Sequence, residues 1–158
     1  HDMADEFLAD SKFEEAIRHF QQILELPAQQ DDGGTLNGLA YLGIGKAQQS
    51  MCKTKEALGS LQKALALALF SGSRTIEQSV YLSMGLSHLE LEEYGTAVAF
   101  LHKHLNILKE LEGGEKVGHR QSYTLLAKAY RGLGQPVKEE EFTFLAAMLD
   151  FSFDFKIN

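Results

Sequence analysis

The stretch YLSMGLSHLELEEYGTAVAFL, residues 81–101, contains two amphipathic helical segments separated by a turn, with Gly85 inside the first segment. Glycine costs roughly 1 kcal/mol relative to alanine in a helix interior, so another contribution must favour it there. A similar stretch lies upstream, YLGIGKAQQSMCKTKEALGSLQKAL, residues 41–65. Four residue pairs recur at an offset of 40 positions and indicate an internal repeat: Tyr41 and Tyr81, Gly45 and Gly85, Ala57 and Ala97, and Leu61 and Leu101.

Weaker copies of this pattern lie on both sides. Downstream, YTLLAKAYRGLGQP keeps Tyr123, Ala127 and a turn glycine, Gly134. Upstream, MADEFLADSKFEEAIRHFQQILELP supplies Ala16 at the position of Ala57. A period of about 40 residues predicts a helical solenoid, in which stacked helix pairs cover apolar faces that a single pair would leave open.

Composition agrees with an all-helical protein. The chain has 158 residues, 44% of them apolar, with two prolines and no tryptophan. Its formal net charge of −7 disfavours nonspecific binding to nucleic acid, because such binding requires cations that neutralise phosphates. No apolar run approaches the length of a membrane span, and HDMADEF lacks a secretion signal. The single cysteine, Cys52, cannot form an internal disulfide, which favours a cytoplasmic protein.

Apolar spacing and turn residues predict one all-α domain, residues 1–158, with four antiparallel helix pairs. The repeats span approximately 3–30, 36–71, 75–112 and 119–150, and a tail or cap follows at 151–158. The expected helices are Met3–Asp10, Phe13–Leu26, Leu36–Met51, Lys55–Phe70, Thr75–Leu91, Tyr94–Leu111, His119–Leu133 and Val137–Leu149.

The repeated glycine is explained by helix packing. A small residue on the first helix of a pair lets the second helix approach closely. The closer packing at Gly45 and Gly85 is expected to offset the low helix propensity of glycine. Replacing Gly85 by leucine is therefore expected to overpack this contact and destabilise the protein by about 1 to 3 kcal/mol.

These residues resemble the tetratricopeptide repeat (TPR) family. The second repeat matches at Tyr41, Ile44, Gly45, Ala57, Leu61 and Ala64, and the third at Tyr81, Met84, Gly85, Tyr94, Ala97 and Leu101. The fourth matches at Tyr123, Leu126, Ala127, Tyr130 and Gly134, but Glu139 stands near the usual alanine. The repeat of about 40 residues is longer than the usual 34 and is similar to the LGN/Pins and rapsyn type of scaffold. The resemblance implies a right-handed superhelix, noncatalytic and without cofactors, whose first helices line a groove for a peptide or helix of a partner.

Helical geometry places the groove residues opposite the stripe of aromatic residues and glycine. The expected partner-binding residues are Leu42, Lys46, Gln49, Leu82, Leu86, Leu89, Gln121, Lys128 and Arg131, with Ser50, Glu90 and Thr124 on the same faces. This set predicts a partner segment with acidic and apolar residues, the apolar ones supplying most of the affinity. Each residue taken alone is also compatible with an ordinary solvated position. Leu42 and Lys46 disfavour the asparagine-containing clamp with which some members of the family hold a chaperone's terminal carboxylate.

The sequence does not favour an enzyme or a metal site. His102 and His104 are two positions apart, unlike the spacing of three or four with which helical residues share a metal. The segment EGGEKVG lacks the spacing of a phosphate-binding loop and is expected to be a connector. Adjacent carboxylates such as Glu92 and Glu93 are expected to be solvated.

The tail carries Phe151, Phe153 and Phe155, a period of two that predicts an extended segment with one buried face. It could cap the last repeat, continue into a further repeat, or dock on a neighbouring chain. Docking on a neighbouring chain would give the alternative function. The protein would then be a scaffold module that self-associates into a homo-oligomer through its terminal repeat and its Phe-rich tail.

Overall fold

The computed structural model describes residues 3–27, 34–112 and 119–157. Regular structure in these ranges is entirely α-helical. The chain divides into two compact units, residues 1–83 and 84–158. Most of the expected connector PAQQDDGGT and nearly all of EGGEKVG lie outside the described residues. A single domain with four repeats remains a prediction.

The described residues form seven helices: α1 (Met3–Glu25), α2 (Thr35–Ser50), α3 (Thr54–Ser71), α4 (Arg74–Glu90), α5 (Tyr94–Glu112), α6 (His119–Gly132) and α7 (Pro136–Ile157). The boundary between the two units falls within α4. The predicted limits of α2 to α6 agree with these bounds to within one residue at each end. Apolar periodicity and the turn residues between helices were therefore sufficient for the central helices.

The predicted break between Asp10 and Phe13 is wrong, because α1 is one continuous helix. This segment contains neither glycine nor proline, and Ser11 Oγ donates a hydrogen bond of 3.0 Å to the Phe7 carbonyl one turn earlier. Serine therefore satisfies its hydroxyl within the helix and does not end it. The first predicted helix pair is thus a single helix.

The predicted extended tail is also wrong, because the backbone of α7 remains helical to Ile157. No proline or glycine follows Pro136 within this helix. A lone extended segment needs a partner for its backbone N–H and C=O groups, whereas a helix pairs these groups internally. The side chains of Phe151, Phe153 and Phe155 lie outside the described part of the structure.

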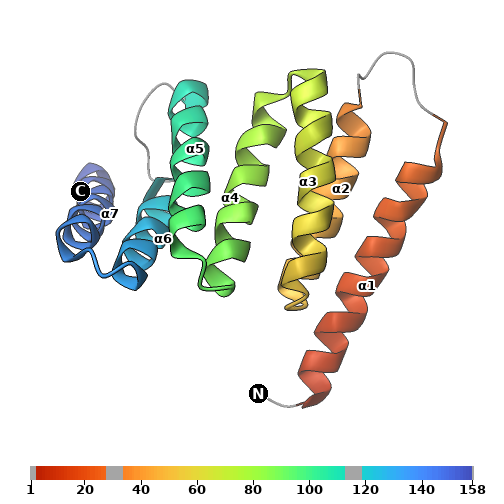
Figure 1. Cartoon of the computed structure of the whole chain (residues 1–158), viewed down its shortest axis with the longest axis horizontal. Helices are drawn as coiled ribbons and strands as arrows, with labels where there is room; N and C mark the ends of the chain where they lie inside the picture. Colours follow the sequence, from red (N-terminus) through yellow and green to blue (C-terminus); the bar gives the residue numbers. More distant parts are fainter. Residues whose placement is uncertain (1–2, 28–33, 113–118, 158) are drawn as a thin grey trace. The chain divides into compact units, whose positions relative to one another are not determined.

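In the first unit, α2 packs between α1 and α3. Figure 1 shows α1, α2 and α3 as neighbours, and α2 packs on both of the others. The Phe20 ring of α1 occupies the position that a Cβ at Gly43 would take, so Gly43 permits this close contact. A Cβ at Gly45 would stand 2.8 Å from Leu61 of α3, which confirms the packing reason for this glycine.

In the second unit, the same contact recurs between the C-terminal half of α4 and α5. A Cβ at Gly85 would stand 2.8 Å from Cδ2 of Leu101, a leucine with no exposed surface. Helix α6 packs on α5 and on α7. The buried His104 on α5 and Ser122 on α6 form one link between helices, with 2.7 Å from Nε2 to Oγ.

The turns after α2, α4 and α6 share one hydrogen-bonded structure. The left-handed residue is Cys52, Glu92 or Gly134, with φ of 59°, 57° and 69°. Its N–H donates to the carbonyl three residues earlier, and the next N–H donates to the carbonyl five residues earlier, which satisfies the open carbonyls of the helix end. The repeat seen in the sequence therefore has a local structural counterpart in each hairpin.

Candidate functional site

The predicted partner-binding residues of the first unit are largely engaged in packing. Leu42 is 6% exposed, so the expectation that it faces outward is wrong. The physical reason is that α2 has helices packed on it from more than one side. Gln49 Nε2 donates a hydrogen bond of 3.3 Å to the Ser83 carbonyl on α4. Lys46 is exposed and Leu82 is half-buried.

The predicted residues of the second unit are more open. Gln121, Lys128 and Arg131 are exposed along α6, and Leu86 is half-buried on α4. Leu89 is only 7% exposed, so it too was wrongly expected to face outward, although it contributes to the pocket described next.

A pocket of about 610 Å³ joins the end of α4, the start of α5 and the end of α6. We call it the α6 pocket; its lining residues are Leu89, Glu90, Glu92, Tyr94, Lys128, Arg131 and Gly132. It brings together Leu89, Lys128 and Arg131 of the predicted set. The Tyr94 ring packs closely against Gly132, where a Cβ would stand 2.5 Å from the ring.

The α6 pocket carries opposite charges on its two sides. Lys128 and Arg131 belong to α6, and Glu90 and Glu92 belong to the end of α4 and the following turn. The Arg131 side chain is 79% exposed, and its Nε lies 4.0 Å from Glu139 Oε1, the limit for an ion pair. Exposed pairs at this distance contribute little to stability, so Arg131 is available to an incoming carboxylate.

Sequence reasoning had not assigned Tyr94, Glu92 and Gly132 to the binding set. Tyr94 and Glu92 belong to the turn after a first helix, and Gly132 precedes the next turn. The predicted set contains residues of the first helices only. The signal that could have found the others is the pairing of a bulky turn residue with a glycine near the end of the following first helix.

His102 and His88 take part in packing between helices. His102 Nε2 lies 3.1 Å from the Tyr130 hydroxyl, and its ring meets Phe142 of α7 edge-on, with centroids 5.7 Å apart. His88 stacks on Phe100 at a centroid distance of 5.4 Å. In the described ranges, no group of three His, Cys, Asp or Glu side chains is arranged to hold a metal ion.

The His102 environment disfavours the protonated ring. Partial burial lowers the pKa of His102 below its ordinary value of 6.5, and the charges of Lys138 and Lys109 lower it further. Glu141 opposes this shift. His102 is therefore a neutral packing residue at neutral pH.

A buried polar group lies in the N-terminal half of α4. Glu77 is 8% exposed, and both of its carboxylate oxygens accept hydrogen bonds from Arg74 Nη1, at 3.1 and 3.2 Å. Burial raises the pKa of Tyr81, and the Glu77 carboxylate raises it further through its charge and a hydrogen bond. These groups are occupied with one another, as in a structural network.

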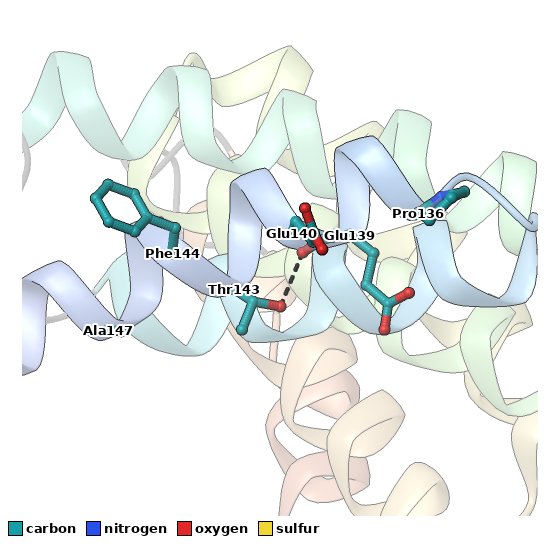
Figure 2. A pocket seen from close by; sticks show the side chains of 6 residues that line it. All are labelled: Pro136, Glu139, Glu140, Thr143, Phe144 and Ala147. Carbon is teal, nitrogen blue, oxygen red and sulfur yellow. Dashed lines mark hydrogen bonds between the residues drawn. The ribbon is translucent and has the colours of Figure 1, made fainter.

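A second concave surface follows α7, and we call it the α7 hollow. It measures about 630 Å³ and is lined by Pro136, Glu139, Glu140, Thr143, Phe144 and Ala147. Figure 2 shows these residues along successive turns of the helix. The dashed bond in that view is the Thr143 hydroxyl donating to the Glu139 carbonyl at 2.8 Å.

No protein-family model matches the chain, and no curated protein matches it. Within the described ranges, no helix combines the length and the apolar character needed to cross a membrane.

Proposed function

We propose that this protein is a noncatalytic adaptor of the tetratricopeptide-repeat type that binds a peptide or helix of another protein. The observation that carries the proposal is the α6 pocket, where an apolar floor lies beside exposed cations. Leu89 and Tyr94 supply apolar and aromatic surface, and Lys128 and Arg131 supply positive charge. This combination fits an apolar anchor next to an acidic side chain.

The charges of the α6 pocket also orient the bound segment. An acidic side chain is attracted by Lys128 and Arg131 and is repelled by Glu90 and Glu92 on the other side. The partner's acidic residue therefore lies towards α6, and its apolar residue contacts Leu89 and Tyr94. Opposed charges of this kind contribute to specificity more than to affinity.

The repeat architecture supports the family assignment that we propose. The three hairpin turns share their hydrogen bonds, and Gly45 and Gly85 make equivalent contacts with Leu61 and Leu101. We infer from these repeated features a right-handed superhelix of helix pairs. A single cysteine, Cys52, which is exposed and free, fits a reducing compartment such as the cytoplasm.

The test begins with selection from a random peptide library displayed on phage, using the whole chain as bait. We expect enrichment of peptides in which an acidic residue lies close to a leucine or an aromatic residue. A synthetic copy of a selected peptide should bind the Lys128→Glu, Arg131→Glu variant at least about tenfold more weakly, a loss of about 1.4 kcal/mol or more.

The matched control is the Lys12→Glu, Arg18→Glu variant, which makes the same change of charge at exposed positions on α1. Its affinity should equal that of the wild type. Equal losses in both variants would mean that general electrostatics, not the α6 pocket, holds the peptide, and the proposal would fail.

A further inference from the structure

Helix α7 departs from the packing register of α5. Helix α5 buries a stripe at successive turns, Ala97, Leu101 and Leu105, each at most 3% exposed, and it also buries His104 and Ile107. Tyr81 and Tyr123 set the offset between these repeats at 42 positions, so the equivalent stripe on α7 is Glu139, Thr143 and Ala147. Thr143 and Ala147 are exposed, and all three residues line the α7 hollow.

An aromatic anchor accounts for this departure. Helix α7 buries Phe142 in place of Thr143, so the buried position moves from the equivalent of Leu101 to that of the half-buried Phe100. Ala146 is buried like its equivalent, His104. The Phe142 ring stacks on Tyr130 of α6 at a centroid distance of 5.6 Å and an interplanar angle of 5°. A shift of one residue turns a helix face by about 100°. The stripe that is buried in the preceding pair is therefore open on α7.

Beside the open stripe of Glu139, Thr143 and Ala147, three apolar side chains of α7 are exposed, and one of them, Phe144, also lines the α7 hollow. Val137, Phe144 and Met148 are 78%, 63% and 44% exposed. Their spacing of seven and four residues places them on one side of the helix. Exposed apolar residues gathered on one helix face mark an interaction surface, unlike single exposed residues.

The charge of the α7 hollow is negative. Its lining includes the carboxylates of Glu139 and Glu140 and no basic residue. Glu139 lies near Arg131, and the neighbouring Glu141 pairs with Lys138 at 3.1 Å. In the described part of the chain, Glu140 has no such counter-charge and is exposed. An occupant that places a cation here would neutralise this carboxylate.

We propose that the α7 hollow docks a basic amphipathic helix of a partner protein. The partner's apolar side chains contact Phe144 and Ala147, and a lysine or arginine on its flank pairs with Glu140. A helix suits this surface because its lining residues follow α7 over successive turns, and Val137 and Met148 extend the apolar surface beside Phe144. This surface shares no lining residue with the α6 pocket, although Glu139 and Arg131 lie 4.0 Å apart between them, and it selects the opposite charge. It therefore extends the proposed function to a second partner.

The test uses the whole chain and a synthetic amphipathic helix of about five turns, with leucine along one face and lysine on both flanks. A comparison helix keeps the leucines and replaces every lysine by glutamate. Binding is measured by fluorescence anisotropy of the labelled helix. We expect the lysine helix to bind at least about tenfold more tightly than the glutamate helix.

Variants separate docking at α7 from general attraction to an acidic protein. Glu140→Lys and Phe144→Ser should each weaken binding of the lysine helix by about tenfold. Their matched controls, Glu14→Lys on α1 and Phe70→Ser on α3, change exposed residues in the same way and should leave the affinity unchanged. Glu140→Lys should also strengthen binding of the glutamate helix.

Three results would overturn the proposal. The first is an equal loss of affinity in the variants and their controls, and the second is equal binding of the lysine and glutamate helices. The third is a concentration-dependent dimer that Phe144→Ser abolishes while the lysine helix fails to bind. The last result would assign the α7 hollow to a second copy of the chain. The helicity of each variant is checked by circular dichroism. If Phe144→Ser loses helicity, the test of docking rests on Glu140→Lys, which changes an exposed residue. The Lys128→Glu variant should bind the lysine helix as tightly as the wild type does. Failure of the α6 pocket proposal can therefore be distinguished from failure of the α7 hollow proposal.

Discussion

At the scale of single residues, the same amino acid has opposite roles depending on the helix facing it. Gly45 lies against Leu61, which is fully buried and cannot move aside for a new methyl group. Gly59 has no atom within 4 Å of the position where its Cβ would lie. Glycine at the first position is required by packing, whereas at the second it only lowers helix propensity.

We therefore expect opposite effects from two alanine substitutions in the first unit. Gly45→Ala should lower the free energy of unfolding by about 1 to 3 kcal/mol, because its Cβ overpacks the contact with Leu61. Gly59→Ala should raise it by up to about 1 kcal/mol. Urea unfolding followed by circular dichroism measures both changes. Equal stability of the Gly45→Ala variant and the wild type would contradict the close helix approach.

At the scale of elements, the hairpin turns show how the chain ends its first helices. Each turn needs one residue in the left-handed region, which costs non-glycine residues roughly 1–2 kcal/mol. Gly134 meets this need without strain, but Cys52 and Glu92 adopt positive φ with a side chain present. The turn is thus set by its hydrogen bonds and not by glycine alone.

Cys52→Gly should accordingly raise the free energy of unfolding by about 1 kcal/mol, because glycine relieves the strain at φ 59°. Gly134→Ala should lower it by a similar amount. Thermal unfolding of the two variants beside the wild type measures these shifts. If Cys52→Gly lowers the melting temperature, contacts of the Cys52 side chain outweigh the backbone strain.

At the scale of the whole chain, acid stability depends on the aromatic contacts that join α5, α6 and α7. His102 has a folded-state pKa below 6.5, so the unfolded chain binds its proton more readily. Its contribution is fully present above pH 6.5 and is lost as the pH falls from there through the lower folded pKa. Protonation would place a third cation near Lys138 and Lys109.

We expect the wild type to lose more stability between pH 7 and pH 5 than a His102→Gln variant, which has no titrating ring. The difference between the two slopes, from urea titrations at several pH values, isolates His102 from the other histidines. Parallel slopes would show that protonation of His102 does not disturb the packing of α7.

The sequence by itself determined the helical class, the limits of α2 to α6 and the glycine contacts at Gly45 and Gly85. These features depend on neighbours within one helix pair, and the pairing of glycine with leucine occurs in two repeats of the sequence. Part of the candidate site was also predictable, since Leu89, Lys128 and Arg131 meet in one pocket. The charge of each pocket residue follows from its type, and the helix face on which it lies follows approximately from helical periodicity.

Only the tertiary structure decided which residues of the helices stay exposed. Periodicity gives one helix a face but not the number of helices that cover it, so Leu42 and Leu89 are buried against expectation. Likewise, Ser11 does not interrupt α1, and Phe142, not Thr143, anchors α7. The continuity of α1 involves a bond within that helix, whereas the burial of Leu42 and Leu89 and the anchoring of α7 depend on other helices. The Phe142 ring, for example, stacks on Tyr130 of α6.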